Sequence, residues 1–216
     1  MTSSPSPGTP QTANPFAAPA PALTFERLLL VGTGALHAWQ LPTWVSWLRM
    51  TYPRLGLRTV ITRSAERFVT RQTLTALGGR ETLVDEWPPD TDTGAGAGAL
   101  HVELAQWADA VLVYPATVNF ISRYATGMAD TPVLLALQCL QAPVAVAPCL
   151  PPGADRSETV RTHLATLSAQ KNVVVVPTVP GRSVTTGRDD ARVPPPMPAV
   201  VEQLQARHTA LRTEAA

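Results

Sequence analysis

The chain has 216 residues, 45% of them apolar, and its 17 basic and 16 acidic side chains leave a formal net charge of +1 at pH 7. This composition supplies enough apolar surface for one globular domain of ordinary size. The balanced charge gives no electrostatic reason to expect nucleic acid or an anionic membrane as a partner. No uncharged apolar run reaches the roughly 18 residues that a membrane-spanning helix needs.

Residues 1–23 form a leader rich in proline and alanine. They contain six prolines and no charged side chain. The leader lacks the basic start and the continuous apolar segment of a secretory signal. We therefore predict that residues 1–23 are disordered.

Short apolar runs alternate with helical patterns through the middle of the chain. The apolar runs are typical of buried parallel strands, and they lie at residues 27–31, 57–61, 110–114, 144–147 and 173–176. The helical patterns lie at residues 37–50, 64–78, 121–141 and 156–170, with a closing helix within 199–216. Alternation of this kind predicts an α/β fold of three layers, in which a parallel sheet lies between helices.

Two segments read as loops. Residues 88–99 are too rich in glycine to form a helix or a strand. Residues 177–198 are rich in proline, glycine and arginine. Loops of that length in a compact domain are usually disordered or functional.

The two cysteines, Cys139 and Cys149, form neither a disulfide framework nor a CxxC metal site. No metal is therefore expected. Unpaired thiols suit a reducing compartment, and we expect the protein to act in the cytoplasm.

Polar side chains follow the predicted strands, at the edge where ligands of parallel α/β folds bind. They are Thr33, Thr62, Ser64, Thr117, Asn119 and the pair Pro148-Cys149. The glycines around Thr33 match the dinucleotide-binding motif only weakly, because its third glycine and the acidic residue after the second strand are missing. Hydroxyl groups at this edge suit a phosphate or a flavin ribityl chain. Alternatively, Thr62 and Ser64 only cap the following helix.

His101 opens the stretch HVELAQWADAVLVYPATVNF, which leads from a helical turn into a buried strand. An isolated histidine at the start of a helix is often structural or solvated. An unperturbed imidazole also titrates near neutral pH and can accept a proton in catalysis. The residue by itself leaves both roles open.

Two segments resemble the homo-oligomeric flavin-containing cysteine decarboxylases, which include phosphopantothenoylcysteine decarboxylase and the lanthipeptide C-terminal cysteine decarboxylases. HVELAQWADAVLVYPATVNFISRYATGMAD is similar to the family's histidine, its WAD helix end, its PASANT flavin motif and its A-x-G-x-A-D motif. TRSAERFVTRQTL is similar to the family's second flavin-contacting turn. The resemblance covers about residues 26–150.

The resemblance implies a flavodoxin-like (Rossmann-type) fold with FMN as cofactor, FAD being the alternative. It also implies a homotrimer, often assembled further into a dodecamer, with the flavin held between subunits. Residues 24–176 are then the flavin-binding domain, 177–198 a flexible substrate flap and 199–216 the C-terminal helix.

The resemblance assigns site residues position by position. His101 matches the active-site base, and Asn119 is the second catalytic candidate. The implied flavin-binding residues are Thr33, Gly34, Ala35, Thr62, Ser64, Phe68, Ala116, Thr117 and Asn119. Ala35, Val118 and Phe120 depart from the family's residues at their positions.

The substrate-binding segment differs from the family's P-x-M-N-x-x-M-W clamp. Here the chain reads APCLPPGADR, with Leu150 and Pro151 where the methionine and asparagine belong. A guanidinium can instead hold a carboxylate with two hydrogen bonds. We expect substrate contacts from Pro148, Cys149, Arg182 and Arg188, with Arg192 as a further candidate. The alternative is that these arginines only keep the loop soluble.

The resemblance also implies a reaction. In the family, the flavin oxidises the cysteine side chain to a thioaldehyde, which accepts the electrons released by decarboxylation. The coenzyme A pathway enzyme then reduces the enethiol with a flap cysteine, but this sequence has no cysteine after Cys149 and has Ser183 in the flap. We therefore expect oxidative decarboxylation of the C-terminal cysteine of a ribosomally synthesised precursor peptide, giving an aminoenethiol for an aminovinyl-cysteine product. The alternatives are phosphopantothenoylcysteine decarboxylase and a non-catalytic flavin-binding regulatory subunit.

Overall fold

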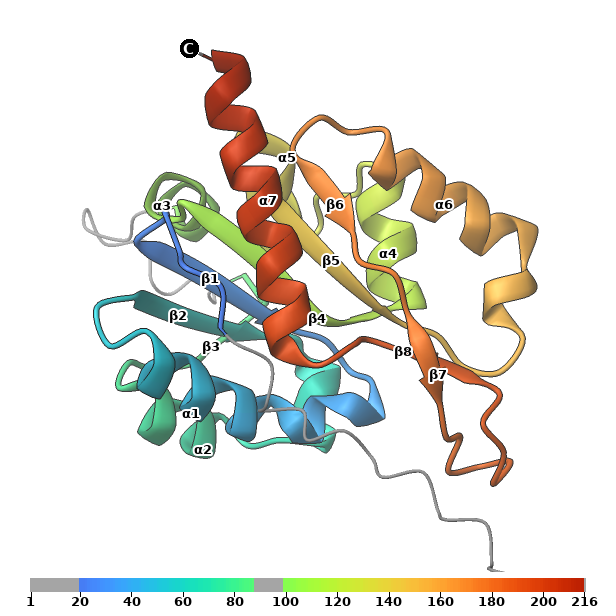
Figure 1. Cartoon of the computed structure of the whole chain (residues 1–216). Helices are drawn as coiled ribbons and strands as arrows, with labels where there is room; N and C mark the ends of the chain where they lie inside the picture. The colour runs from blue at the N-terminus through green and yellow to red at the C-terminus, as the bar shows by residue number, and fades with distance from the viewer. Residues whose placement is uncertain (1–19, 88–98, 216) are drawn as a thin grey trace, which may run out of the picture.

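The computed structural model describes residues 20–87 and 99–215, which form an α/β fold with a six-stranded parallel sheet between helices (Figure 1). The strands of this sheet are β1 (Arg27–Gly32), β2 (Gly56–Ile61), β3 (Leu83–Val84), β4 (Ala110–Thr117), β5 (Val144–Cys149) and β6 (Val173–Val175). The predicted fold class is confirmed. The two-residue strand β3 was not predicted.

The strand order is β3-β2-β1-β4-β5-β6. Without the short β3, the remaining order corresponds to the 2-1-3-4-5 order of flavodoxin-like sheets. The order reverses between β1 and β4, which are hydrogen-bonded neighbours. Ligands of such folds bind at this reversal, outside the carboxyl ends of the strands.

Helices cover both faces of the sheet (Figure 1). One face packs against α1 (Leu41–Thr51), α2 (Arg71–Gly78) and α7 (Met197–Ala215). The other packs against α3 (Leu100–Trp107), α4 (Val118–Ala125), α5 (Pro132–Cys139) and α6 (Glu158–Ser168). Successive side chains of a strand point to opposite faces, so Leu28 and Leu30 enter one core and Leu29 and Val31 the other. This explains why an unbroken apolar run makes β1.

Three predicted helices are interrupted in the structure. The first and second each begin with a 3-10 turn, η1 (Leu36–Gln40) and η2 (Arg63–Arg67), and a third short turn, η4 (Ala154–Arg156), precedes α6. The helix predicted over residues 121–141 is two helices, α4 and α5. Gly127 adopts a φ of 73° between them, and Thr131 caps α5 by accepting a hydrogen bond from the N–H of Leu134.

The segment predicted as a flexible flap contains an antiparallel hairpin of β7 (Val179–Gly181) and β8 (Ala191–Val193). The hairpin is joined to the end of β5, since the Leu150 N–H donates to the Arg192 carbonyl (2.7 Å) and the Arg192 N–H donates back (3.0 Å). It therefore stands at the carboxyl edge of the sheet. Its movement on substrate binding stays a prediction.

Two predicted loops fall largely outside the described residues, namely 1–19 of the leader and 88–98. The last leader residues contact the domain: the Tyr52 hydroxyl donates to the Pro21 carbonyl (2.8 Å), and Leu23 packs against the core. Pro21 and Leu23 of the predicted leader therefore pack against the domain.

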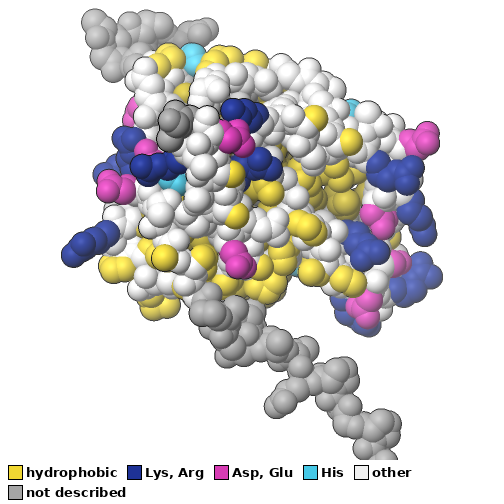
Figure 2. Space-filling view, turned by 45° about the horizontal axis from the view of Figure 1, so that its top comes forward, with side chains coloured by type: hydrophobic (Ala, Val, Ile, Leu, Met, Phe, Trp, Pro, Cys, Tyr) yellow, Lys and Arg dark blue, Asp and Glu magenta, His cyan; other side chains and the backbone are white. Residues whose placement is uncertain are grey.

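The surface carries charges of both signs. Figure 2 shows Lys and Arg side chains beside Asp and Glu side chains, with apolar side chains exposed between them. Among residues 20–87 and 99–215, no helix is long and apolar enough to cross a bilayer.

Candidate functional site

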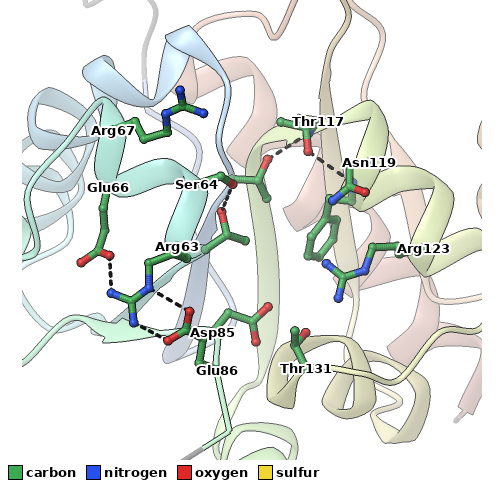
Figure 3. Close-up of a pocket in the computed structure, with 13 residues that line it drawn as sticks. Arg63, Ser64, Glu66, Arg67, Asp85, Glu86, Thr117, Asn119, Arg123 and Thr131 are labelled. Atoms are coloured by element: carbon green, nitrogen blue, oxygen red, sulfur yellow. Dashed lines mark hydrogen bonds and ion pairs between the residues drawn. The ribbon is translucent and has the colours of Figure 1, made fainter.

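A polar cavity of about 760 Å³ lies at the carboxyl ends of β1 to β4, where the strand order reverses (Figure 3). We call it the polar cavity. It is lined by Thr33, Thr62, Arg63, Ser64, Glu66, Arg67, Asp85, Glu86, Thr117, Asn119, Phe120, Arg123 and Thr131. Five of the predicted flavin-binding residues thus share one cavity, as the convergence of parallel strand ends predicts.

Thr33 braces the sheet at the reversal point. Its side chain is almost fully buried, its hydroxyl donates to the Pro115 carbonyl (2.6 Å), and it accepts from the Thr117 N–H (2.9 Å). The Thr117 hydroxyl in turn accepts from the Phe120 N–H (3.2 Å) and caps α4. Both threonines therefore fix the backbone of the cavity wall.

Thr33→Val is expected to lower the free energy of unfolding by about 1–3 kcal/mol, because it leaves the Thr117 N–H without its partner, whereas the Pro115 carbonyl keeps the Thr33 N–H (3.3 Å). Thr62→Val is the control, since within the described part of the chain the Thr62 hydroxyl hydrogen-bonds only to the exposed Ser64 hydroxyl (3.1 Å). We expect a loss of less than about 1 kcal/mol. Urea denaturation measures both. Equal losses in the two variants would contradict the bracing role.

Gly34 allows the first loop to pack directly on the second turn. A Cβ atom at Gly34 would lie 2.3 Å from Ser64 Oγ and 2.5 Å from Ser64 Cβ. Helix α2 is capped by Thr70, whose hydroxyl accepts from the Thr73 N–H (3.2 Å). Thr62 occupies the N-cap position of η2, but its side chain makes no capping hydrogen bond there. Both Thr62 and Ser64 line the polar cavity.

Three arginines line the polar cavity. Arg63 pairs with Glu66 (2.7 Å) and with Glu86, which lowers the pKa of Glu86. Arg123 pairs with Asp130 (2.5 Å). Within the part of the chain that the structure describes, Arg67 makes no ion pair. A guanidinium without a protein carboxylate is a suitable partner for a phosphate.

Asp85 lies at the floor of the polar cavity (Figure 3). It is 4% exposed, and its Oδ1 accepts from the Val133 N–H at the start of α5 (2.8 Å). Its Oδ2 is buried with no hydrogen-bond partner among the described residues. Burial raises the pKa of this carboxyl group, and the Val133 N–H, the Thr131 side chain and the charge of Arg123 offset the effect only in part. Such an oxygen needs a donor, which a ribityl hydroxyl would supply. The residues present therefore fit a flavin mononucleotide.

A second cavity of about 420 Å³ lies between the first loop, the end of β5 and the β7–β8 hairpin. We call it the hairpin cavity. Thr117 and Asn119 line both cavities, so the two are adjacent. Apolar walls come from Ala35, Leu150 and Val184. Gly34, Cys149, Arg182 and Ser183 also line it.

The three arginine candidates differ in their ion-pair partners. Arg188 pairs with Asp190 (3.2 Å), and Arg192 pairs with Asp155 (3.3 Å). Arg182 lines the cavity, and no carboxylate of the described residues lies within ion-pair distance of it. Arg182 is therefore the guanidinium available to a ligand.

Five predicted site residues line neither cavity, and neither does the further candidate Arg192; the five are Phe68, His101, Ala116, Pro148 and Arg188. Ala116 is fully buried in β4, paired with Pro148 of β5, so both act through the backbone of the sheet edge. Phe68 is 37% exposed and lies beyond η2.

His101 also lies outside both cavities. Its ring packs edge-on against Trp87, with 5.7 Å between ring centroids, and its buried Nδ1 has no hydrogen-bond partner among the described residues. The Trp87 indole N–H donates to the Asp130 carbonyl (2.9 Å), and Asp130 pairs with Arg123 of the cavity wall. His101 is thus linked to the wall of the polar cavity through Trp87 and Asp130 but does not line the cavity itself.

Sequence reasoning missed several residues of the two cavities. Among them are Arg63, Arg67, Asp85 and Arg123. Arg63 lies two residues after the predicted strand 57–61, a signal that could have found it, whereas Asp85 follows the unpredicted strand β3. His37 lines the hairpin cavity. It follows the first glycine-rich loop, and only the position of the hairpin reveals its role.

The model of the flavoprotein family matches residues 20–208. The chain belongs to this family. A cypemycin cysteine dehydrogenase (decarboxylating) from a Streptomyces species is 32% identical over 154 residues, which are 69% of this chain and 75% of that protein. The coenzyme A biosynthesis bifunctional protein CoaBC of Vibrio vulnificus is 34% identical over 112 residues, 52% of this chain. The chain described here spans only 27% of the length of CoaBC.

Solved structures agree with this family assignment. The cypemycin decarboxylase CypD has a TM-score of 0.69 and 27% identity, covering 90% of this chain and 99% of CypD. The FMN-dependent cysteine decarboxylase SpaF has a TM-score of 0.69 and 25% identity, covering 84% of this chain and 96% of SpaF. The expected membership of the flavin-containing cysteine decarboxylases is confirmed.

Proposed function

We propose that this flavoprotein is an FMN-dependent enzyme that oxidatively decarboxylates the C-terminal cysteine of a ribosomally synthesised precursor peptide to an aminoenethiol. The observation that carries the proposal is the adjacency of the two cavities, which share Thr117 and Asn119. One offers hydroxyl, amide and guanidinium groups for FMN, and the other offers Arg182 for a carboxylate. The similarity to the decarboxylating cypemycin enzyme supports the same reaction.

The polar cavity would hold the cofactor. Thr62, Ser64 and Thr117 offer hydroxyls to the ribityl chain, and Arg67 offers a charge to the phosphate. Asn119, at the boundary of the cavities, would contact both flavin and substrate. When bound, FMN would accept the two electrons released as the cysteine side chain is oxidised.

The hairpin cavity would hold the peptide end. Arg182 binds the α-carboxylate and orients the Cα–carboxyl bond that breaks. The buried Leu150 shields one side of the carboxylate from water, which strengthens its interaction with Arg182. Carbon dioxide leaves as a neutral molecule, which the apolar walls accommodate.

His101 would act on the cavity of a neighbouring subunit in a homotrimer, or in a dodecamer built from trimers. Its Nδ1 is buried and unpaired within the described residues, and its ring faces neither cavity of its own chain. Light scattering with size-exclusion chromatography measures the assembly. The free thiols of Cys139 and Cys149 support action in the reducing cytoplasm.

The direct test combines spectroscopy with mass spectrometry. The purified protein is expected to show a visible flavin band and to release FMN rather than FAD on chromatography. Incubation with a Cys-terminal peptide is expected to remove CO2 and two hydrogens from the peptide. Turnover of phosphopantothenoylcysteine alone would favour the coenzyme A reaction. A flavin-bound protein that converts neither substrate would indicate a regulatory subunit.

Arg182→Gln is expected to raise KM for the peptide about 10- to 100-fold, because a charge-assisted hydrogen bond to a carboxylate contributes about 1.5–3 kcal/mol. Arg188→Gln is the matched control, since Arg188 pairs with Asp190 outside the cavity. Initial rates over a range of peptide concentrations measure both effects. A similar rise in KM for the two variants would reject Arg182 as the carboxylate ligand.

A further inference from the structure

His37 and Cys149 form a polar contact on the wall of the hairpin cavity. Nδ1 of His37 lies 3.8 Å from the sulfur of Cys149, and both side chains line the cavity together with Arg182. His37 comes from η1 after the first loop, and Cys149 ends β5. The contact therefore joins two strand ends on either side of the substrate space.

Both groups of this pair are neutral at pH 7. Burial lowers the pKa of His37 below its usual value near 6.5. Burial also raises the pKa of Cys149 to about 11, against a hydrogen bond with the His37 backbone. A neutral imidazole has one nitrogen that accepts a hydrogen bond. With the Nδ1–H of His37 donating to the Cys149 sulfur, Nε2 is the acceptor nitrogen that remains for a ligand.

A C-terminal cysteine carries a carboxylate and a thiol separated by only two carbon atoms. The hairpin cavity has one side chain for each group, Arg182 for the carboxylate and His37 for the thiol. Within the described residues, neither side chain is held in an ion pair. The two are therefore available to a single ligand residue.

We propose that His37 recognises the thiol of the substrate's terminal cysteine and holds its proton during the reaction; this inference rests on the proposed function. As the C–S single bond becomes double, the S–H proton passes to His37 while the Cβ hydrogen leaves with two electrons to the bound flavin. The Cα–carboxyl bond then breaks, CO2 leaves, and the electron pair forms the Cα–Cβ double bond and an enethiolate sulfur. That sulfur takes the proton back from His37.

The first test is disulfide trapping, which reads out position without turnover. The FMN-loaded protein is incubated with a Cys-terminal peptide whose thiol carries a hydroxyethyl disulfide, and the modified cysteine is mapped by mass spectrometry. Cys139 is exposed and serves as the internal control. Because the thiol of Cys149 has a raised pKa, its intrinsic exchange is slow. Preferential capture at Cys149 therefore reports placement of the peptide end beside His37.

We expect the peptide to attach to Cys149 at least about tenfold faster than to Cys139. The control reagent bis(hydroxyethyl) disulfide, which lacks the peptide, is expected to label Cys139 faster than Cys149. Arg182→Gln is expected to abolish the preference. Equal labelling of the two cysteines by the peptide would overturn the placement.

The second test is the pH profile of His37→Gln, a variant that keeps a hydrogen-bonding side chain but cannot hold the proton. We expect kcat to fall about 100-fold and the acid limb of kcat/KM, set by protonation of His37 below neutral pH, to disappear. Unchanged flavin absorbance shows that the variant is folded. A variant with normal kcat and an unchanged profile would reject the role of His37 while leaving the proposed decarboxylation intact. Absence of decarboxylation by the wild-type protein, with Cys149 still captured, would reject the proposed reaction instead.

Discussion

His101→Asn is expected to lower kcat for peptide decarboxylation by about 10²- to 10⁴-fold, the usual contribution of a general acid or base. Asparagine keeps a polar side chain of similar size but cannot take up a proton near neutral pH. The ring lines neither cavity of its own chain, so the flavin content is expected to stay unchanged. Mass spectrometry of the peptide gives the rate, and visible absorbance gives the flavin.

His208→Asn is the matched control. His208 lies on α7, where its ring packs edge-on against Phe25 with 5.6 Å between centroids and its Nδ1 contacts the Thr24 hydroxyl (2.9 Å). It lines neither the polar nor the hairpin cavity. We expect its kcat to equal that of the wild type. A His101→Asn variant with the same unchanged kcat would show that the assigned base is wrong.

Mixed oligomers test where His101 acts. One variant, Arg182→Gln, lacks the carboxylate ligand, and the other, His101→Asn, lacks the base. If His101 serves a neighbouring subunit, co-assembly of the two variants restores some sites that contain both native residues. Activity above the sum of the separate variants is the expected result. No recovery in confirmed mixed assemblies would place His101 in the same chain as the cavity that it serves.

The sheet could be predicted because its strands are specified locally. Leu28 to Val31 are buried on both faces, so the strand appears in the sequence as a continuous apolar run. The hairpin of β7 and β8 carries no such signal, because its strands VPG and ARV are short and rich in proline, glycine and arginine. It is held by hydrogen bonds between Leu150 and Arg192, residues that are distant in sequence. The two-residue β3 is likewise a consequence of its pairing with β2.

The site was predictable in part for the same reason. Thr33, Thr62 and Thr117 follow strands, and the carboxyl ends of parallel strands converge at one edge. The arginines of the hairpin have the same residue type and lie within one segment, so only their carboxylate partners distinguish them. Asp190 pairs with Arg188 and Asp155 pairs with Arg192, whereas Arg182 lines the hairpin cavity. No pattern in one sequence contains that information.

Gly34→Ala is expected to weaken flavin binding about 10- to 100-fold, since overpacking typically costs 1–3 kcal/mol and each 1.4 kcal/mol is a factor of ten. The new Cβ would lie 2.3 Å from Ser64 Oγ, 2.5 Å from Ser64 Cβ and 2.9 Å from the Ser64 backbone carbon. Rotation of the serine side chain relieves only the first contact. The second turn must therefore move outward, away from Thr33 and Thr117 on the opposite wall.

Gly78→Ala is the control for this prediction. A Cβ at Gly78 would meet its nearest neighbour, Val45 Cγ1, at 3.7 Å, an ordinary contact within α2. Alanine also favours helix over glycine by about 1 kcal/mol, so this variant is expected to be more stable and to bind flavin normally. Fluorescence titration with FMN measures the affinity, and urea denaturation measures the stability. If Gly34→Ala lost stability but kept its affinity for FMN, the wall formed by Thr62 and Ser64 would not contact the cofactor, and the flavin would have to be held by the Thr117 and Asn119 side alone.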